Sequence, residues 1–112
     1  MNFSIENKNG FVIFTLKVKN LDSENSANLK AELLIICQPT VKGLILDISN
    51  VEYIDSSGLG ALLLAHRQLK EYETAITLVG AQEVVKSMLN ISQLIELFRL
   101  EDTIEDAIAS YN

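Results

Sequence analysis

The chain contains no tryptophan, one proline, one cysteine and one histidine among 112 residues, and these scarcities exclude several kinds of chemistry. A single cysteine cannot form an intrachain disulfide, and one cysteine with one histidine cannot build a zinc site of the usual kind. Cys37 lies in the apolar run 33–37, so we expect a buried small hydrophobic residue. Aromatic residues make up only 6% of the chain, which predicts an aliphatic core.

Positive charge is also scarce, because nine Lys and Arg stand against 15 Asp and Glu, a net charge of −6. The basic residues form no run, so we expect no nucleic-acid partner; a phosphate backbone requires a basic surface. The longest apolar stretch, 59–65, has seven residues, whereas a membrane span needs about 20. We therefore expect a cytoplasmic protein without membrane insertion, cofactor or metal.

Machinery for catalysis is missing as well. A serine hydrolase needs a base within hydrogen-bond reach of its nucleophile. The only histidine, His66, follows Ser56 by ten residues on the same predicted helix, which is about 15 Å along the helix axis. The chain has neither a Gly-x-Ser-x-Gly elbow nor a Gly-x-x-x-x-Gly-Lys phosphate loop. We expect no enzymatic activity.

Hydrophobic periodicity predicts a single α/β domain over residues 1–112. Alternating residues around the turn Asn9-Gly10 predict two strands, at 3–5 and 12–18, and nearly continuous apolar runs predict buried strands at 43–48 and 75–79. Helical spacing appears after the loop 22–26 up to Pro39, at 59–72, at 84–89 and from Thr103 to Ala109, with a last strand near Phe98. The expected order is β-β-α-β-α-β-α-β-α, with about four helices and a mixed, mostly parallel sheet.

The most informative segment is the hexapeptide 55–60, DSSGLG, because it places two hydroxyls where a predicted helix begins. The first N–H groups of a helix lack partners within the helix and carry a positive dipole, so this position accommodates a phosphate. An ordinary N-terminal cap also explains Asp55 and its serines, and the residues alone favour that simpler interpretation. They do not separate Ser56 from Ser57. Gly58 and Gly60 indicate a close approach, either by a partner or by the neighbouring strand.

Residues 47–60, DISNVEYIDSSGLG, together with Leu21-Asp22 and parts of 85–98, resemble the STAS domains, and among them the anti-sigma factor antagonists. The resemblance covers essentially the whole chain. It implies a single-domain STAS fold and a module that binds an anti-sigma factor, often itself a serine kinase, and so frees a sigma factor. Phosphorylation of the serine after the Asp blocks this binding, and a serine phosphatase restores it.

By this resemblance Ser56 is the phosphate acceptor, and Ser57 is the second choice. Gly58 and Gly60, which have no side chains, would let a partner approach the helix backbone closely. Lys19-Asn20 and Asn25-Ser26 depart from the residues common in the family, and the departures fall in the partner-facing loop. The partner-binding residues implied by the resemblance are Asp22, Ser23, Asn25, Ser26, Asp55, Ser56, Ser57, Gly58, Leu59 and Gly60.

Two alternative functions stay open. The chain could be a constitutive STAS scaffold, never phosphorylated, in another signalling or transport-regulating complex, and phosphopeptide mapping from cells distinguishes it. It could also be a STAS domain that binds a small ligand or nucleotide, which a thermal shift with nucleotides distinguishes.

Overall fold

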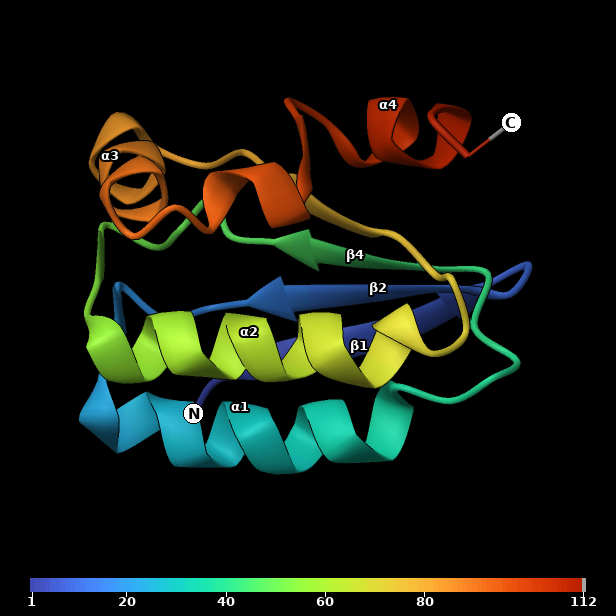
Figure 1. Ribbon diagram of the computed structural model, residues 1–112, viewed down its shortest axis with the longest axis horizontal. Coiled ribbons are helices and arrows are strands. Elements are labelled where there is room, and N and C mark those ends of the chain that lie inside the picture. Colours follow the sequence, from blue (N-terminus) through green and yellow to red (C-terminus); the bar gives the residue numbers. More distant parts are fainter. Residues whose placement is uncertain (112) are drawn as a thin grey trace.

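In the computed structural model, which describes residues 1–111, a five-stranded sheet lies between helices on its two faces (Figure 1). The strands are β1 (Phe3–Lys8), β2 (Phe11–Leu16), β4 (Gly43–Asp47), β6 (Ile76–Val79) and β7 (Arg99–Glu101), in spatial order β1-β2-β4-β6-β7. β1 pairs with β2 antiparallel, and the other three pairings are parallel. The predicted fold class, a mixed and mostly parallel α/β sheet, is confirmed.

All four predicted helices are present: α1 (Ser23–Ile36), α2 (Ser56–Lys70), α3 (Glu83–Ile91) and α4 (Ile104–Ala109), with a short 3-10 helix at Ile95–Leu97. α1 ends before Pro39, which cannot continue a helix. Thr103 caps α4, because its hydroxyl accepts a hydrogen bond from the backbone N–H of Asp106 at 3.1 Å. α1 and α2 lie side by side on one face of the sheet, and α4 lies on the other (Figure 1). The expected domain ends at residue 112, which lies outside the described residues.

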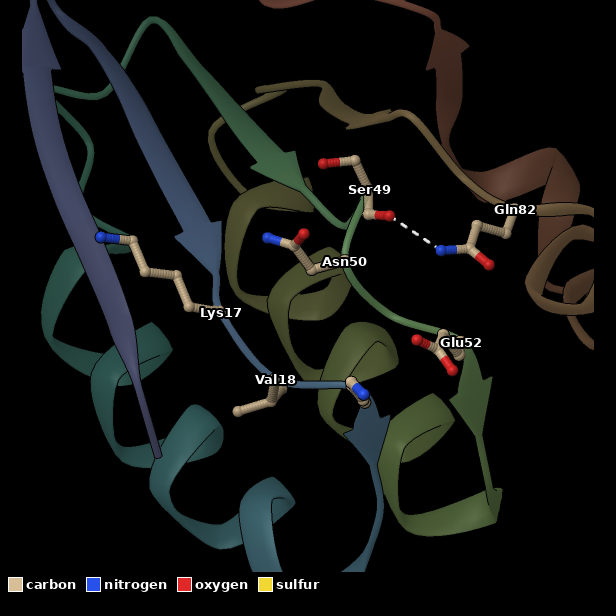
Figure 2. A pocket seen from close by; sticks show the side chains of 7 residues that line it. Lys17, Val18, Ser49, Asn50, Glu52 and Gln82 are labelled. Atoms are coloured by element: carbon tan, nitrogen blue, oxygen red, sulfur yellow. Dashed lines mark hydrogen bonds between the residues drawn. The ribbon is translucent and has the colours of Figure 1, made fainter.

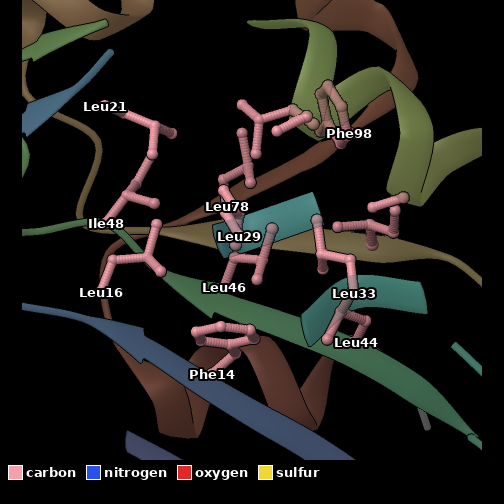
Figure 3. Packing of buried hydrophobic residues seen from close by; sticks show 14 of the residues in the cluster. Phe14, Leu16, Leu21, Leu29, Leu33, Leu44, Leu46, Ile48, Leu78 and Phe98 are labelled. Carbon is pink, nitrogen blue, oxygen red and sulfur yellow. The ribbon is translucent and has the colours of Figure 1, made fainter. Parts of the chain in front are cut away.

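The strands are apolar because both faces of the sheet are covered. In β2, Phe14 and Leu16 face the core beneath α1 and α2, whereas Ile13 joins the smaller cluster beneath α4. The core is aliphatic, as predicted: leucines from α1 and from the central strands pack around Phe14 (Figure 3). Cys37 is buried, as predicted, and burial raises the pKa of its thiol to about 11, so the thiol stays protonated and unreactive at neutral pH.

Two short strands were missing from the predicted order. β3 (Asn20–Leu21) and β5 (Tyr53–Ile54) pair in parallel as a separate two-stranded sheet. A strand of two residues is too short to show an alternating pattern, and its partner lies 33 positions away in the chain. This small sheet determines where the functional site lies, because β3 runs directly into α1 and β5 runs directly into α2.

Candidate phosphorylation and docking site

The N-termini of α1 and α2 begin next to one another. The β3–β5 pairing aligns Leu21 with Ile54, and the backbone N–H of Asp55 donates to the carbonyl of Leu21 at 3.2 Å. The segments Leu21-Asp22-Ser23 and Ile54-Asp55-Ser56 therefore lie in parallel and lead into parallel helices (Figure 1). The carboxyl ends of β2 and β4 point to the same edge of the molecule, which is the edge where open α/β sheets bind ligands.

An aspartate caps each of these helices. Asp22 Oδ1 accepts hydrogen bonds from the backbone N–H groups of Glu24 at 3.1 Å and Asn25 at 3.4 Å. Asp55 Oδ1 accepts from the backbone N–H groups of Ser57 at 2.9 Å and Gly58 at 3.1 Å. The caps are thus aspartates, and the serine that follows each of them is not needed for capping.

The two serines of the motif differ in their surroundings. The Ser57 hydroxyl donates to Asp55 Oδ1 at 2.6 Å and is half-buried. Ser56 is exposed, and its hydroxyl makes no hydrogen bond within residues 1–111. Of these two hydroxyls, the one on Ser56 is therefore both accessible and free to react.

The Asp55 carboxylate is held in its ionised form. The Ser57 hydroxyl, and then the backbone N–H of Gly58, lower the pKa of this carboxyl below its ordinary value, while desolvation acts in the opposite direction. Further contributions come from the backbone N–H groups of Ser57 and Ser23. Because Ser23 belongs to α1, the Asp55 charge acts on both helix N-termini.

The lowered pKa predicts a pH-dependent contribution of Asp55 to stability. A carboxyl whose pKa is depressed by folding stabilises the native state above its unfolded pKa of about 3.9, and this contribution is lost as the pH falls through the folded value. Asp55→Ala should therefore lower the free energy of unfolding at pH 7, with the difference from the parent shrinking below about pH 4. Urea unfolding at pH 7, 5, 4 and 3 measures this. The exposed Asp102→Ala is the control, and a pH-independent loss in Asp55→Ala would contradict the assignment.

Three residues of the expected partner-binding set are buried. Ser26 and Leu59 are 4% and 8% exposed, respectively, and Gly58 is buried as well. A Cβ on Gly58 would lie 2.3 Å from the carbonyl oxygen of Leu21, so the body that approaches this glycine is the neighbouring strand. The expectation that Gly58 lets a partner approach the helix backbone closely is thereby corrected. These three residues lie beneath the surface that a partner would contact.

The other residues of that set reach the surface. Ser23 and Ser56 are exposed, and Asn25 is half-buried with its side-chain amide donating to the carbonyl of Asn20 at 2.7 Å. Asp22, Asp55, Ser57 and Gly60 are also half-buried. The two helix starts thus bring these residues, from segments more than 30 positions apart, into one surface.

A cavity of about 310 Å³ adjoins this surface and was not expected from the sequence (Figure 2). Lys19 and Glu52, which precede β3 and β5, are linked by a hydrogen bond from the Glu52 backbone N–H to the Lys19 carbonyl at 2.7 Å. Elsewhere in the cavity wall, the Gln82 side-chain amide donates a hydrogen bond to the backbone carbonyl of Ser49 at 2.9 Å. Beyond the polar residues that follow β2 and β4, nothing in the sequence indicated this cavity. The lining residues are Lys17, Val18, Lys19, Ser49, Asn50, Glu52 and Gln82.

Other kinds of site were searched for in the part of the chain that the structure describes. Within residues 1–111, no group of three His, Cys, Asp or Glu side chains is placed to hold a metal ion. No helix in this range combines the length and the apolar character needed to cross a membrane. α2 is continuous from Ser56 to Lys70, and His66 packs edge-on against Phe98 at 6.3 Å between ring centroids. The Ser56 hydroxyl therefore has no histidine base within reach.

Comparison with known families agrees with this geometry. The STAS domain family matches residues 2–107. The chain belongs to the STAS family. The resemblance inferred from residues 47–60 is thereby confirmed at the level of the family.

Individual STAS relatives match over nearly their full length. The chain is 26% identical to BtrV of Bordetella bronchiseptica, a protein named as a candidate anti-sigma factor antagonist, over 99% of this chain and 95% of the relative. A protein of Thermotoga maritima that is described as a candidate anti-sigma factor antagonist superimposes with a TM-score of 0.86 at 24% identity, covering 97% of this chain and 93% of that one.

Another solved protein with the same fold is the anti-sigma factor antagonist SpoIIAA of Bacillus. Its unphosphorylated form superimposes with a TM-score of 0.83 at 22% identity, covering 97% of this chain and 95% of that one. Its phosphorylated form gives a TM-score of 0.77 at 22% identity, covering 99% and 100%.

Proposed function

We propose that this STAS domain is an anti-sigma factor antagonist whose binding is switched by phosphorylation of Ser56. The unphosphorylated form binds an anti-sigma factor, and the phosphorylated form releases it. One observation carries the proposal: Ser56 is the exposed, unengaged hydroxyl at the start of α2, beside the start of α1, whereas the Ser57 hydroxyl is held by Asp55. A modification there changes the charge of the docking surface without disturbing a cap. The docking surface consists of the exposed and half-buried residues at the starts of α1 and α2, namely Asp22, Ser23, Glu24, Asn25, Asp55, Ser56, Ser57 and Gly60.

The relatives support this proposal. BtrV carries the name of a candidate anti-sigma factor antagonist, and SpoIIAA has been solved in unphosphorylated and phosphorylated forms. In the proposed cycle, a serine kinase that is itself the anti-sigma factor modifies Ser56, and a serine phosphatase reverses the modification. Residues 1–112 act as one unit in the cytoplasm, regulate transcription through a sigma factor, and catalyse no reaction.

The docking surface is acidic, which indicates the chemistry of its partner. Asp22 and Asp55 cap the two helices, and Glu24 lies in the first turn of α1. The chain as a whole carries a net charge of −6. A basic surface on the anti-sigma factor complements this charge and speeds the encounter, and two further negative charges on Ser56 lie where the partner must make contact.

The identity of the acceptor is tested by mapping the phosphate. We expect a cognate serine kinase to modify Ser56, so Ser56→Ala should abolish labelling while Ser57→Ala retains it. Ser57→Ala loses only its side-chain hydrogen bond to Asp55 and should remain folded. Mass spectrometry of the modified protein locates the phosphate. Phosphate found mainly on Ser57, or undiminished labelling of Ser56→Ala, would refute the assignment.

One observation favours a second function, the binding of a small ligand. The cavity beside β3 and β5 has a volume of about 310 Å³ and contains Lys17 and Lys19, which places it at the lower end of small-molecule sites. A nucleotide bound there would raise the melting temperature of the unmodified protein in proportion to the logarithm of its concentration. An unchanged melting temperature in millimolar nucleotide would exclude nucleotide binding in this cavity.

A further inference from the structure

We infer that Lys30 forms an ion pair with the phosphate on Ser56 and holds that phosphate over the docking surface. The inference rests on the proposed function for the identity of the modified serine. It assigns to Lys30 a role as a positioning residue, through an ion pair between the α1 ammonium and the α2 phosphate.

The first observation is the open space at Gly60. Gly60 follows Ser56 by four positions in α2, so the two residues lie on one face with their Cβ positions about 5–6 Å apart. The Lys30 ammonium nitrogen lies 4.0 Å from the position that a Cβ on Gly60 would occupy. Apart from the helix's own backbone and the two adjacent residues, no other non-hydrogen atom of the described residues lies closer to that position. The missing side chain leaves a notch between Ser56 and Lys30.

The second observation is the parallel arrangement of the helices. Pairing of β3 with β5 makes α1 and α2 begin at the same level and run in the same direction (Figure 1). Lys30 follows Ser23 by seven positions, which is about 10 Å along α1. Helical side chains lean toward the N-terminus, so the long lysine side chain reaches back toward the level of Ser56.

The third observation concerns charge. Within residues 1–111 the structure shows one salt bridge, between Lys86 and Glu83 at 3.6 Å, so the Lys30 ammonium has no carboxylate partner there. The nearby Asp22 and Asp55 carboxylates accept backbone hydrogen bonds at the two caps. A phosphate on Ser56 would carry roughly two negative charges and three acceptor oxygens, and a lysine bonds such a group strongly.

This contact would keep the phosphate on the surface that the partner must cover. One ammonium neutralises only part of the phosphate charge, so the modified surface remains more acidic than the unmodified one. The Lys30 ammonium, which already lies beside Gly60, would be engaged by the phosphate and would no longer be free to contact a partner. Both changes oppose docking, and neither requires the backbone to move.

The test is a phosphorus NMR titration of protein with phosphoserine installed at position 56 by genetic encoding. A nearby ammonium lowers the second pKa of the phosphate, which is about 6 when unperturbed. We expect Lys30→Gln to raise the titration midpoint by about 0.5 pH unit, the value for one charge at about 6 Å in water. Lys30→Arg should titrate like the parent. Lys70→Gln is the matched control, because it removes the same charge 14 positions from Ser56, about 21 Å along α2.

Gly60→Leu provides an independent variant, since it fills the notch without changing any charge and should also raise the midpoint. Identical midpoints for the parent, Lys30→Gln and Gly60→Leu would overturn the inference, as would an equal shift in Lys70→Gln. Asp22, Glu24 and Asp55 are unchanged in all of these proteins. Because the phosphate is installed without a kinase, the titration stands apart from the proposed function. Absence of Ser56 modification by any cognate kinase would defeat that function and leave the Lys30 contact intact.

Discussion

Phosphorylation of Ser56 is expected to lower the affinity for the anti-sigma factor by about 1,000-fold while leaving the fold unchanged. The phosphate adds roughly two negative charges at the centre of the proposed docking surface. Burying these charges without a matching cation on the partner costs several kcal/mol, and about 4 kcal/mol corresponds to a factor of about 10³. Lys30 offsets only part of this charge, so the loss of binding persists.

Titration calorimetry with the partner measures this effect across four proteins. Ser56→Ala should bind like the unmodified parent under all conditions, and its stability should change by less than about 0.5 kcal/mol, since Asp55 provides the cap. Ser56→Asp should bind more weakly than the parent but more tightly than the phosphoprotein, because it adds one charge instead of two. Equal affinities of Ser56→Asp and the parent would argue against an electrostatic switch.

The same switch should leave most of the backbone in place. Phosphate at a helix N-terminus is compatible with the fold, because the dipole there is positive. We expect unchanged circular dichroism, with amide shift changes confined to residues 21–30 and 55–61. Shift changes that spread through β2, β4 and β6 would mean a global conformational change and would contradict a local mechanism.

Gly58→Ala should destabilise the protein by about 3 kcal/mol, a typical cost for overpacking a buried site. The new Cβ would lie 2.3 Å from the carbonyl oxygen of Leu21 and 2.8 Å from Ile54 Cγ1. The first of these atoms belongs to the backbone and cannot rotate away, so β3 has to move away from α2. Because the pairing of β3 with β5 aligns Asp22 with Asp55, a displaced β3 should also weaken partner binding. Urea unfolding gives the loss of stability.

Gly60→Ala is the matched control, two positions further along the same helix. A Cβ there lies 4.0 Å from the Lys30 ammonium, which is an ordinary contact. Alanine is favoured over glycine inside a helix by up to about 1 kcal/mol, so this variant should be slightly more stable than the parent. Opposite signs of the two effects are the expected result. A similar loss of stability in both variants would contradict this, because it would show that any side chain added near the start of α2 is destabilising.

The longer elements could be predicted because their patterns are local. The strands at 12–16 and 43–47 are rich in apolar residues, and the four helices show apolar residues at helical spacing. β3 and β5 could not be predicted. A strand of two residues is too short to show an alternation of apolar and polar side chains, and the pairing joins distant parts of the chain. The site depends on this pairing, so its architecture had to come from the structure.

The candidate site was predictable in its sequence motif and not in its geometry. Residues 55–60 indicated a capped helix start with a modifiable serine, and the resemblance to STAS domains pointed to Ser56. The different surroundings of Ser56 and Ser57 depend on one hydrogen bond to Asp55, which the spacing of the residues does not determine. The burial of Gly58, a residue of helix α2, depends on Leu21 in strand β3.

The sequence by itself determined the α/β class, the STAS family resemblance and the helix start at Asp55, because these depend on local periodicity and on side-chain chemistry within a few residues. Tertiary structure alone decided which serine hydroxyl of the motif is free, which glycine packs against a strand, and which lysine lies beside Gly60. All three depend on α1 and α2 starting together. That alignment is produced by hydrogen bonds between β3 and β5, segments that meet only when the chain folds.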